Sequence, residues 1–219
     1  MTSRPSLLAL CLFLSCLGLS QSCLAEAKPP PARFDAGRAF HHVANLVAIG
    51  PRPSGSPGIA RAQGYIEQTL ASLGVAFEED TFTADTPVGP LAMMNIIAKI
   101  PGELPGVVLL ATHYDTKRLP DFVGANDGGS STGLMLELAR VLAASRPRFT
   151  VWIAFLDGEE AIVEYGPNDG FHGSRHLAAK MQASGELKRV RAMILADLIG
   201  DADLDIRREM NSSPALVHL

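Results

Sequence analysis

Cysteine is scarce in this 219-residue sequence, and its placement excludes two kinds of site. All three cysteines, Cys11, Cys16 and Cys23, lie within the first 23 residues. The rest of the chain can therefore form neither a disulfide framework nor a thiolate metal site. Runs of Lys or Arg are also lacking and the formal net charge is -4, which argues against a nucleic-acid partner.

The apolar run Leu7–Leu19 is too short to span a membrane. It follows the positive charge of Arg4 and precedes Ala25-Glu26-Ala27, a small-residue cleavage signal. We therefore predict a signal peptide over residues 1–27 and no stable membrane span. The alternatives are a buried N-terminal helix and a lipoprotein attached through Cys23.

These features predict an exported protein that is periplasmic or secreted. A short Pro-rich linker is predicted over residues 28–33. One globular domain is predicted over residues 34–219, because 47% of the chain is hydrophobic and can form a core.

Strand-like apolar runs alternate with segments of helical spacing along this domain. Such alternation is typical of a mainly parallel sheet with helices on both faces. We predict an α/β fold, a three-layer α/β/α sandwich with a mixed, mostly parallel sheet. The predicted strands are residues 75–83, 91–100, 107–112, 149–156 and 190–196, and the predicted helices are residues 34–49, 59–73, 134–142 and 174–181.

Polar side chains follow three of these strands and begin one helix. Ligands of open α/β sheets bind beyond the carboxyl ends of the strands, so we expect these side chains to meet at one edge. They are His113 and Asp115 after residues 107–112, Asp157, Glu159 and Glu160 after residues 149–156, Asp197 after the last strand, and Asp127 near a helix start.

A divalent cation explains this cluster better than turns and solvated faces do. Several carboxylates at one edge repel one another unless a cation neutralises them. Each polar residue alone has an ordinary structural explanation. Four polar clusters that each stand at a strand end or a helix start are hard to explain in that way. His with Asp and Glu, and no Cys, suits a catalytic zinc site with an open position. Asp115, two residues after His113, is placed to orient the imidazole.

In this order, the residues resemble the motifs of zinc-dependent aminopeptidases and glutaminyl cyclases, over about Phe34 to the C-terminus. The resemblance implies a phosphorylase/hydrolase-like zinc peptidase fold and is strongest to the glutaminyl-peptide cyclotransferase branch. The motifs are His113-Tyr114-Asp115-Thr116-Lys117, Gly124-Ala125-Asn126-Asp127, the stretch from Phe155 to Ala161, the stretch from Gly173 to Ala178, and Asp197-Leu198-Ile199-Gly200.

The resemblance also implies roles. Asp127 and Glu160 match zinc ligands, and Glu159 matches the general acid/base. Asp197 matches a second-metal ligand of the aminopeptidases or, in cyclases, an acid hydrogen-bonded to the catalytic Glu. His113 matches a second-metal ligand in aminopeptidases and is retained without that metal in cyclases.

Three positions depart from the family patterns. Tyr165 stands where cyclases favour a Trp that lines the substrate pocket. Gly128 stands where the aminopeptidase pattern often has another Asp, which favours the cyclase branch. The family's last zinc ligand is a His near the end of the domain, and His218 comes too soon to match it. We therefore expect a domain that lacks its C-terminal part. We expect this chain, expressed alone, to bind zinc weakly and to be poorly soluble.

The predicted function is conversion of the N-terminal Gln of peptides to pyroglutamate with release of ammonia, with zinc as cofactor. The first alternative is a zinc aminopeptidase that removes N-terminal residues, and the second is an inactive fragment or binding domain. The expected partners are peptide or protein N-termini, and the expected state is a monomer.

Overall fold

The computed structural model describes residues 32–207 and 210–218. The predicted signal peptide, Cys23 and most of the predicted linker lie outside the described residues. Among the described helices, none combines the length and apolar character that a membrane crossing requires.

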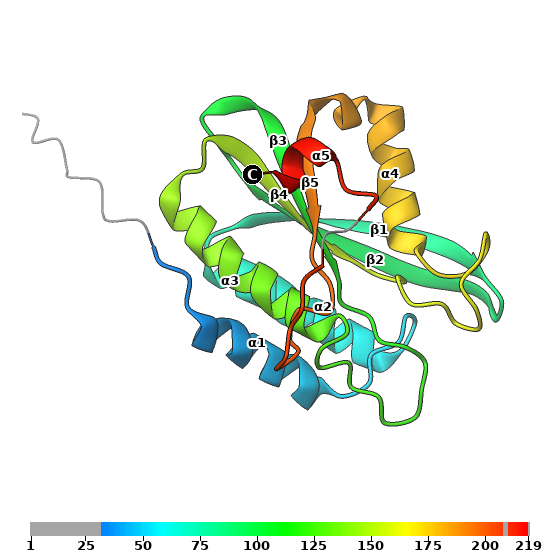
Figure 1. The fold of residues 1–219 in the computed structure, drawn as a ribbon. Coiled ribbons are helices and arrows are strands. Elements are labelled where there is room, and N and C mark those ends of the chain that lie inside the picture. The colour runs from blue at the N-terminus through cyan, green and yellow to red at the C-terminus, as the bar shows by residue number, and fades with distance from the viewer. Residues whose placement is uncertain (1–31, 208–209, 219) are drawn as a thin grey trace, which may run out of the picture. The chain divides into compact units, whose positions relative to one another are not determined.

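A single mixed sheet forms the centre of the described chain, with strand order β1-β2-β4-β3-β5 (Figure 1). The β3–β4 and β3–β5 pairs are parallel, whereas β1–β2 and β2–β4 are antiparallel. Only β2 therefore runs against the other described strands, which confirms the predicted mixed sheet. The strands are β1 Ala76–Thr86, β2 Gly89–Ile100, β3 Leu104–His113, β4 Phe149–Leu156 and β5 Val190–Leu195.

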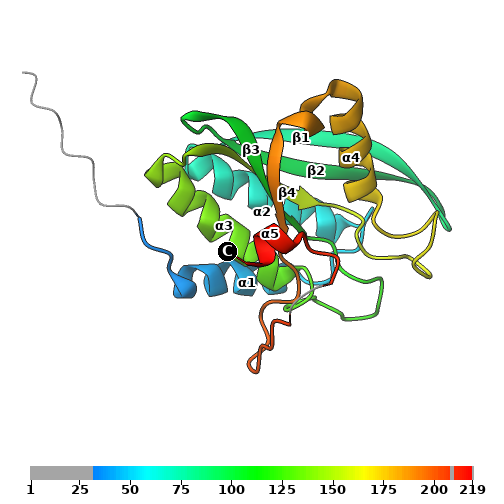
Figure 2. The ribbon, with the colours of Figure 1, turned by 45° about the horizontal axis from the view of Figure 1, so that its top comes forward.

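Helices cover both faces of this sheet (Figures 1 and 2). The α1, α2 and α3 helices pack on one face, and α4 packs on the other. The predicted three-layer arrangement is confirmed. The helices are α1 Ala36–Ile49, α2 Pro57–Ser72, α3 Gly129–Ser145 and α4 His172–Ser184, followed by the short η1 Glu186–Arg189 and α5 Pro214–Val217.

Alternation along β4 shows why the sheet has two cores. Val151, Ile153 and Phe155 point into the core shared with α1, α2 and α3. Trp152 and the alternate residues that follow it point into the core shared with α4. Successive side chains of a strand point to opposite faces, so a continuous apolar run is the pattern of a strand buried on both sides.

The α3 helix begins five residues before its predicted start, directly at the predicted site. Its first turn consists of small polar residues, which helical apolar spacing does not reveal. These residues are buried and bonded to the end of β3: the Ser131 hydroxyl lies 2.7 Å from the Thr112 hydroxyl, and Thr132 Oγ1 donates to the His113 carbonyl at 2.9 Å. These bonds fix the helix start against the strand that carries His113.

The β5 strand is the outermost strand on one side of the described sheet. Its consecutive apolar residues Met193, Ile194 and Leu195 are 49%, 53% and 63% exposed. Central strands such as β4 bury the corresponding residues almost completely. An exposed apolar edge strand offers unpaired backbone groups to other chains.

Candidate metal centre

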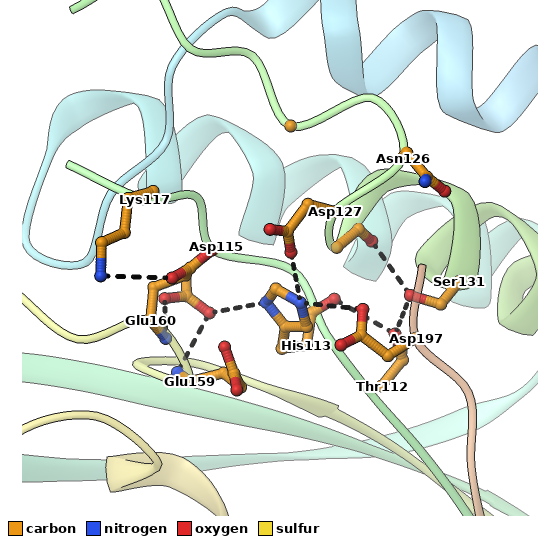
Figure 3. Close-up of polar contacts among 12 residues, drawn as sticks. Thr112, His113, Asp115, Lys117, Asn126, Asp127, Ser131, Glu159, Glu160 and Asp197 are labelled. Atoms are coloured by element: carbon orange, nitrogen blue, oxygen red, sulfur yellow. Dashed lines mark hydrogen bonds and ion pairs between the residues drawn. The ribbon is translucent and has the colours of Figure 1, made fainter. Parts of the chain in front are cut away.

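The carboxyl ends of β3, β4 and β5 bring the predicted site residues to one edge of the sheet. His113 is the last residue of β3 and lies opposite Leu156, the last residue of β4. In β5, Leu195 pairs with Ala111 of β3, and Asp197 follows two residues later. Figure 3 shows the side chains of these three strand ends facing one another. The sequence prediction of a shared edge is confirmed.

The imidazole of His113 lies at the centre of this group, and the residue is 2% exposed. Its Nδ1 lies 3.3 Å from Asp115 Oδ1, and since a carboxylate only accepts, Nδ1 carries the hydrogen. Its Nε2 lies 3.1 Å from Asp127 Oδ1 and 3.3 Å from Asp197 Oδ1, but has no hydrogen-bond partner of good geometry. In the neutral ring Nε2 therefore presents a lone pair to two carboxylate oxygens.

That arrangement requires a positive charge at Nε2. Burial alone would lower the pKa of His113, but the carboxylates of Asp115, Asp127 and Asp197 outweigh it and raise the pKa well above its usual value. Without another cation, a proton takes that place. The ligand atoms of His113, Asp127 and Asp197 all lie within 4.8 Å of one another, which also fits a metal ion.

Glu160 reaches the same group from the end of β4. Its side chain is buried, and burial raises the pKa of its carboxyl. The pKa of Asp127 is lowered, first by its contact with His113 and further by a contact with Glu160. The two predicted zinc ligands, Asp127 and Glu160, are therefore neighbours in space although 33 residues separate them. The group whose ligand atoms lie within 4.8 Å of one another, however, contains Asp197 and not Glu160.

Glu159 differs from its neighbour Glu160 in exposure and in acidity. It is partly exposed, and burial raises the pKa of its carboxyl to about 7. A group with such a pKa exchanges protons readily near neutral pH. The hydroxyl of Tyr165 donates to Glu160 Oε2 at 2.8 Å and to Glu159 Oε2 at 3.2 Å. This hydroxyl connects the two carboxylates, a contact that a Trp at the same position cannot make in the same way.

Tyr165 itself is 46% exposed at the mouth of the site. Its ring centroid lies 5.0 Å from that of Phe171 and 4.8 Å from the Lys117 ammonium. The loop that carries Tyr165 is fixed by the buried carboxylate of Asp169, which accepts the backbone N–H groups of residues 162, 163 and 164 at 2.8, 2.8 and 3.0 Å. Sequence reasoning missed Asp169, because a carboxylate that binds local backbone leaves no periodic pattern.

Two further buried charges next to the site were not assigned roles from the sequence. Asp157 accepts the Ser54 hydroxyl at 2.6 Å and the Met94 N–H at 3.1 Å. Burial, with the nearby charge of Asp115, raises the pKa of Asp157 to about 7. The other charge is Arg52, which stands between two prolines in a loop-forming stretch. The flanking prolines indicate a loop, and they do not indicate that this arginine is buried.

Gly128 is needed immediately before α3. Its φ of 69° lies in the left-handed region that favours glycine. A Cβ at this position would lie 2.9 Å from the Asp115 carbonyl oxygen and 3.0 Å from His113 Cε1. The His113 ring therefore occupies the space that a side chain at residue 128 would need.

Comparison with known proteins now places the chain. The family model of peptidase family M28 matches residues 95–215, more than half of the sequence. The chain belongs to peptidase family M28. Members of this family are metallopeptidases, so a His/Asp/Asp group of metal-binding type at the expected strand ends is consistent with the family chemistry.

The relatives of this M28 chain include glutaminyl cyclases. It is 39% identical over 168 residues to the glutaminyl-peptide cyclotransferase-like protein of Mus musculus, covering 68% of this chain and 44% of that protein. Among solved structures it is similar to an Acidobacteriales bacterium glutaminyl cyclase, with 46% identity, TM-score 0.81 and coverage of 88% of this chain and 68% of that one.

A leucine aminopeptidase precursor from Bacteroides thetaiotaomicron is also similar, with 25% identity, TM-score 0.68 and coverage of 80% and 66%. Both predicted branches are therefore represented among the structural neighbours. The chain spans about half the length of the curated relatives it matches.

Proposed function

We propose that this M28 chain carries the zinc site of a glutaminyl-peptide cyclotransferase, which converts N-terminal Gln of peptides to pyroglutamate and ammonia. The observation that supports it most is the placement of Glu159, with a pKa of about 7, beside His113 and the carboxylates of Asp115 and Glu160. The similarity to glutaminyl cyclases at 39% and 46% identity supports the choice of reaction.

Asp127 and Glu160 would hold the zinc in this proposal, as in the family pattern. When bound, zinc supplies a Lewis acid for the γ-carbonyl oxygen of the substrate glutamine. His113 and Asp197 would border the ion, and Asp115 would keep the His113 ring in one orientation through Nδ1. Tyr165 would line the entrance for the peptide N-terminus.

Glu159 would move the proton in this reaction. The α-amine nitrogen of the substrate forms a bond to the γ-carbonyl carbon, and Glu159 accepts the proton that the amine loses. The bond from that carbon to the side-chain nitrogen then breaks, and Glu159 returns the proton so that ammonia leaves. A pKa of about 7 suits a group that must both accept and donate near neutral pH.

An aminopeptidase is the second candidate, supported by the similarity to the leucine aminopeptidase precursor and by the position of Asp197 close to His113. In that reaction Glu159 would take a proton from the water that attacks the first peptide bond. A non-catalytic binding domain is the third candidate.

Incubation of the zinc-loaded protein with one peptide that begins with Gln and one that begins with Leu separates these functions. Ammonia release from the Gln peptide alone supports the cyclase. Release of a free amino acid supports the aminopeptidase. Bound zinc without either product supports a binding domain, and the absence of zinc by elemental analysis contradicts all the metal-dependent proposals.

Sequencing of the mature N-terminus tests the proposed export, for which cleavage after residue 27 is expected.

A further inference from the structure

Arg52 is a completely buried cation next to the metal centre. Its guanidinium donates three hydrogen bonds, all to backbone carbonyls: Nε to Tyr114 at 2.7 Å, Nη1 to Val123 at 2.6 Å and Nη2 to Gly124 at 2.9 Å. Among the described residues, none of its hydrogen bonds goes to a carboxylate. A buried charge held only by carbonyls is costly, which calls for an explanation.

The three acceptors belong to two segments that carry site residues. Tyr114 stands between His113 and Asp115 at the end of β3. The other two acceptors, at residues 123 and 124, precede Asp127 by four and three residues. The planar guanidinium therefore joins the segment that places the imidazole to the segment that places its carboxylate neighbour.

Backbone contacts of Arg52 reinforce this connection. Its N–H donates to Thr116 Oγ1 at 3.0 Å, and its carbonyl accepts the Thr116 N–H at 3.3 Å. On the other side, the guanidinium lies against Gly124 and Gly129, where a Cβ would be 3.4 or 3.5 Å from Nη2, an ordinary van der Waals contact. The site loops are thus packed around one arginine side chain.

The charge of Arg52 also acts on the site through space. Burial lowers its pKa to about 10, and the nearby carboxylates of Asp115 and Asp127 counteract that effect. The side chain stays positively charged at neutral pH. It therefore offsets part of the negative charge that gathers around His113.

We propose that Arg52 is a positioning residue that sets the distance between His113 and Asp127, and with it the geometry of the metal centre. This inference rests on the proposed zinc site. Lysine cannot replace Arg52, because a single ammonium on a flexible stem cannot span three carbonyls in one plane.

The test compares Arg52→Lys with a matched control, Arg140→Lys. Arg140 also makes several hydrogen bonds through its guanidinium, to the Glu137 carboxylate at 2.8 and 2.6 Å and to the Arg33 carbonyl at 2.8 Å. It lies on α3, outside the metal centre, where Glu137 of α3 accepts the backbone N–H of Asp35 at the start of α1. Both variants keep the positive charge and lose the planar guanidinium with its several N–H donors.

Three measurements are made on both variants and the parent: thermal unfolding by circular dichroism, zinc affinity by chelator competition, and the visible absorption of the cobalt(II) form. The absorption bands of cobalt(II) report coordination geometry. We expect both variants to unfold at lower temperature, but only Arg52→Lys to lose zinc affinity by at least tenfold and to change the cobalt bands. Parent-like zinc affinity and bands in Arg52→Lys, or equal losses in Arg140→Lys, overturn the inference.

Two additions keep the inference testable. If Arg52→Lys does not fold, Thr116→Val takes its place: it removes the acceptor of the Arg52 N–H and should shift the cobalt bands away from those of the parent, whereas parent-like bands contradict the inference. If the parent binds neither zinc nor cobalt, the proposed function fails, and amide hydrogen exchange of the metal-free protein then decides on Arg52. Faster exchange at residues 123–129 in Arg52→Lys, with no change in Arg140→Lys, supports the positioning role, whereas unchanged exchange contradicts it.

Discussion

The carboxylate of Asp115 accepts the backbone N–H of Glu160 at 3.1 Å, across 45 residues of sequence. Its other oxygen accepts the N–H of Glu159 at 3.2 Å and lies 3.3 Å from His113 Nδ1. One buried carboxylate thus connects the end of β3 to the loop after β4, and it orients the imidazole and both glutamates at once.

Asp115→Asn is expected to weaken the metal centre. An amide offers one oxygen and turns an NH2 donor toward one of the two backbone N–H groups. We expect zinc affinity to fall roughly tenfold to hundredfold, and the free energy of unfolding of the metal-free protein to fall by about 1–3 kcal/mol. Chelator competition and urea unfolding measure the two effects. Asp85→Asn, an exposed site at the end of β1, is the control and should change neither.

Glu160→Gln and Glu159→Gln should separate metal binding from proton transfer. Glu160 contacts Asp127 inside the group, so its neutralisation should lower zinc affinity. Glu159→Gln should keep the zinc and reduce turnover by about 10²–10⁴, the usual contribution of a general acid/base. Zinc content and ammonia release are measured on both variants. Equal zinc loss in the two would show that the roles are wrongly assigned.

The raised pKa values of the buried carboxyls should make the free energy of unfolding depend on pH. Burial raises the pKa values of Glu159 and Asp157 to about 7, from 4.5 and 3.8. Between those values the folded state binds more protons than the unfolded state, so the free energy of unfolding falls as the pH rises. The contribution is complete below the unfolded pKa values and is lost as the pH passes about 7. The raised pKa of His113 acts in the same direction.

The variant Glu159→Gln isolates one part of that slope. Carboxyls with lowered pKa values, such as Asp127 and Glu137, titrate below this range and do not affect the comparison. We expect urea unfolding of the metal-free protein between pH 5 and pH 8 to show a shallower decline in Glu159→Gln than in the parent. The exposed Glu164→Gln serves as control. Parallel curves for the parent and Glu159→Gln would contradict a raised pKa.

The exposed edge of β5 should govern association between chains. Ile194 is 53% exposed and pairs with Leu110 of β3 in the parallel register. Ile194→Lys places a charge on the edge strand, a device that natural sheets use against edge-to-edge pairing. We expect less light scattering in concentrated solution. Val88→Lys replaces a residue of similar exposure, 54%, in the turn between β1 and β2, and should leave the scattering unchanged. Equal effects would exclude a specific role of β5.

Parts of the fold that depend on buried apolar runs were predictable from the sequence. The bounds of β4 agree with the prediction, because each of its residues from Val151 onward is buried. The prediction missed the outer ends of β1 and β2, where Asp85 pairs with Pro90 and polar residues interrupt the pattern. It also missed the first turn of α3, whose small polar residues bond to β3 rather than fill the core.

The candidate site divides in the same way. Side chains that follow buried strands, such as His113 and Glu160, could be predicted to share an edge because parallel strands end together. Arg52 and Asp169 could not, because each binds the backbone of loops whose course depends on the whole fold. The contact of the Tyr165 hydroxyl with Glu159 and Glu160 likewise depends on how the loop after β4 returns.

The close contact between Gly128 and the His113 ring restricts what residue 128 can be. An Asp at residue 128, as in the aminopeptidase pattern, would need the backbone to leave its φ of 69° and the ring to move away from a Cβ at 3.0 Å. Any side chain at residue 128 would therefore act on the imidazole directly, so the bare backbone of this turn is one wall of the metal centre.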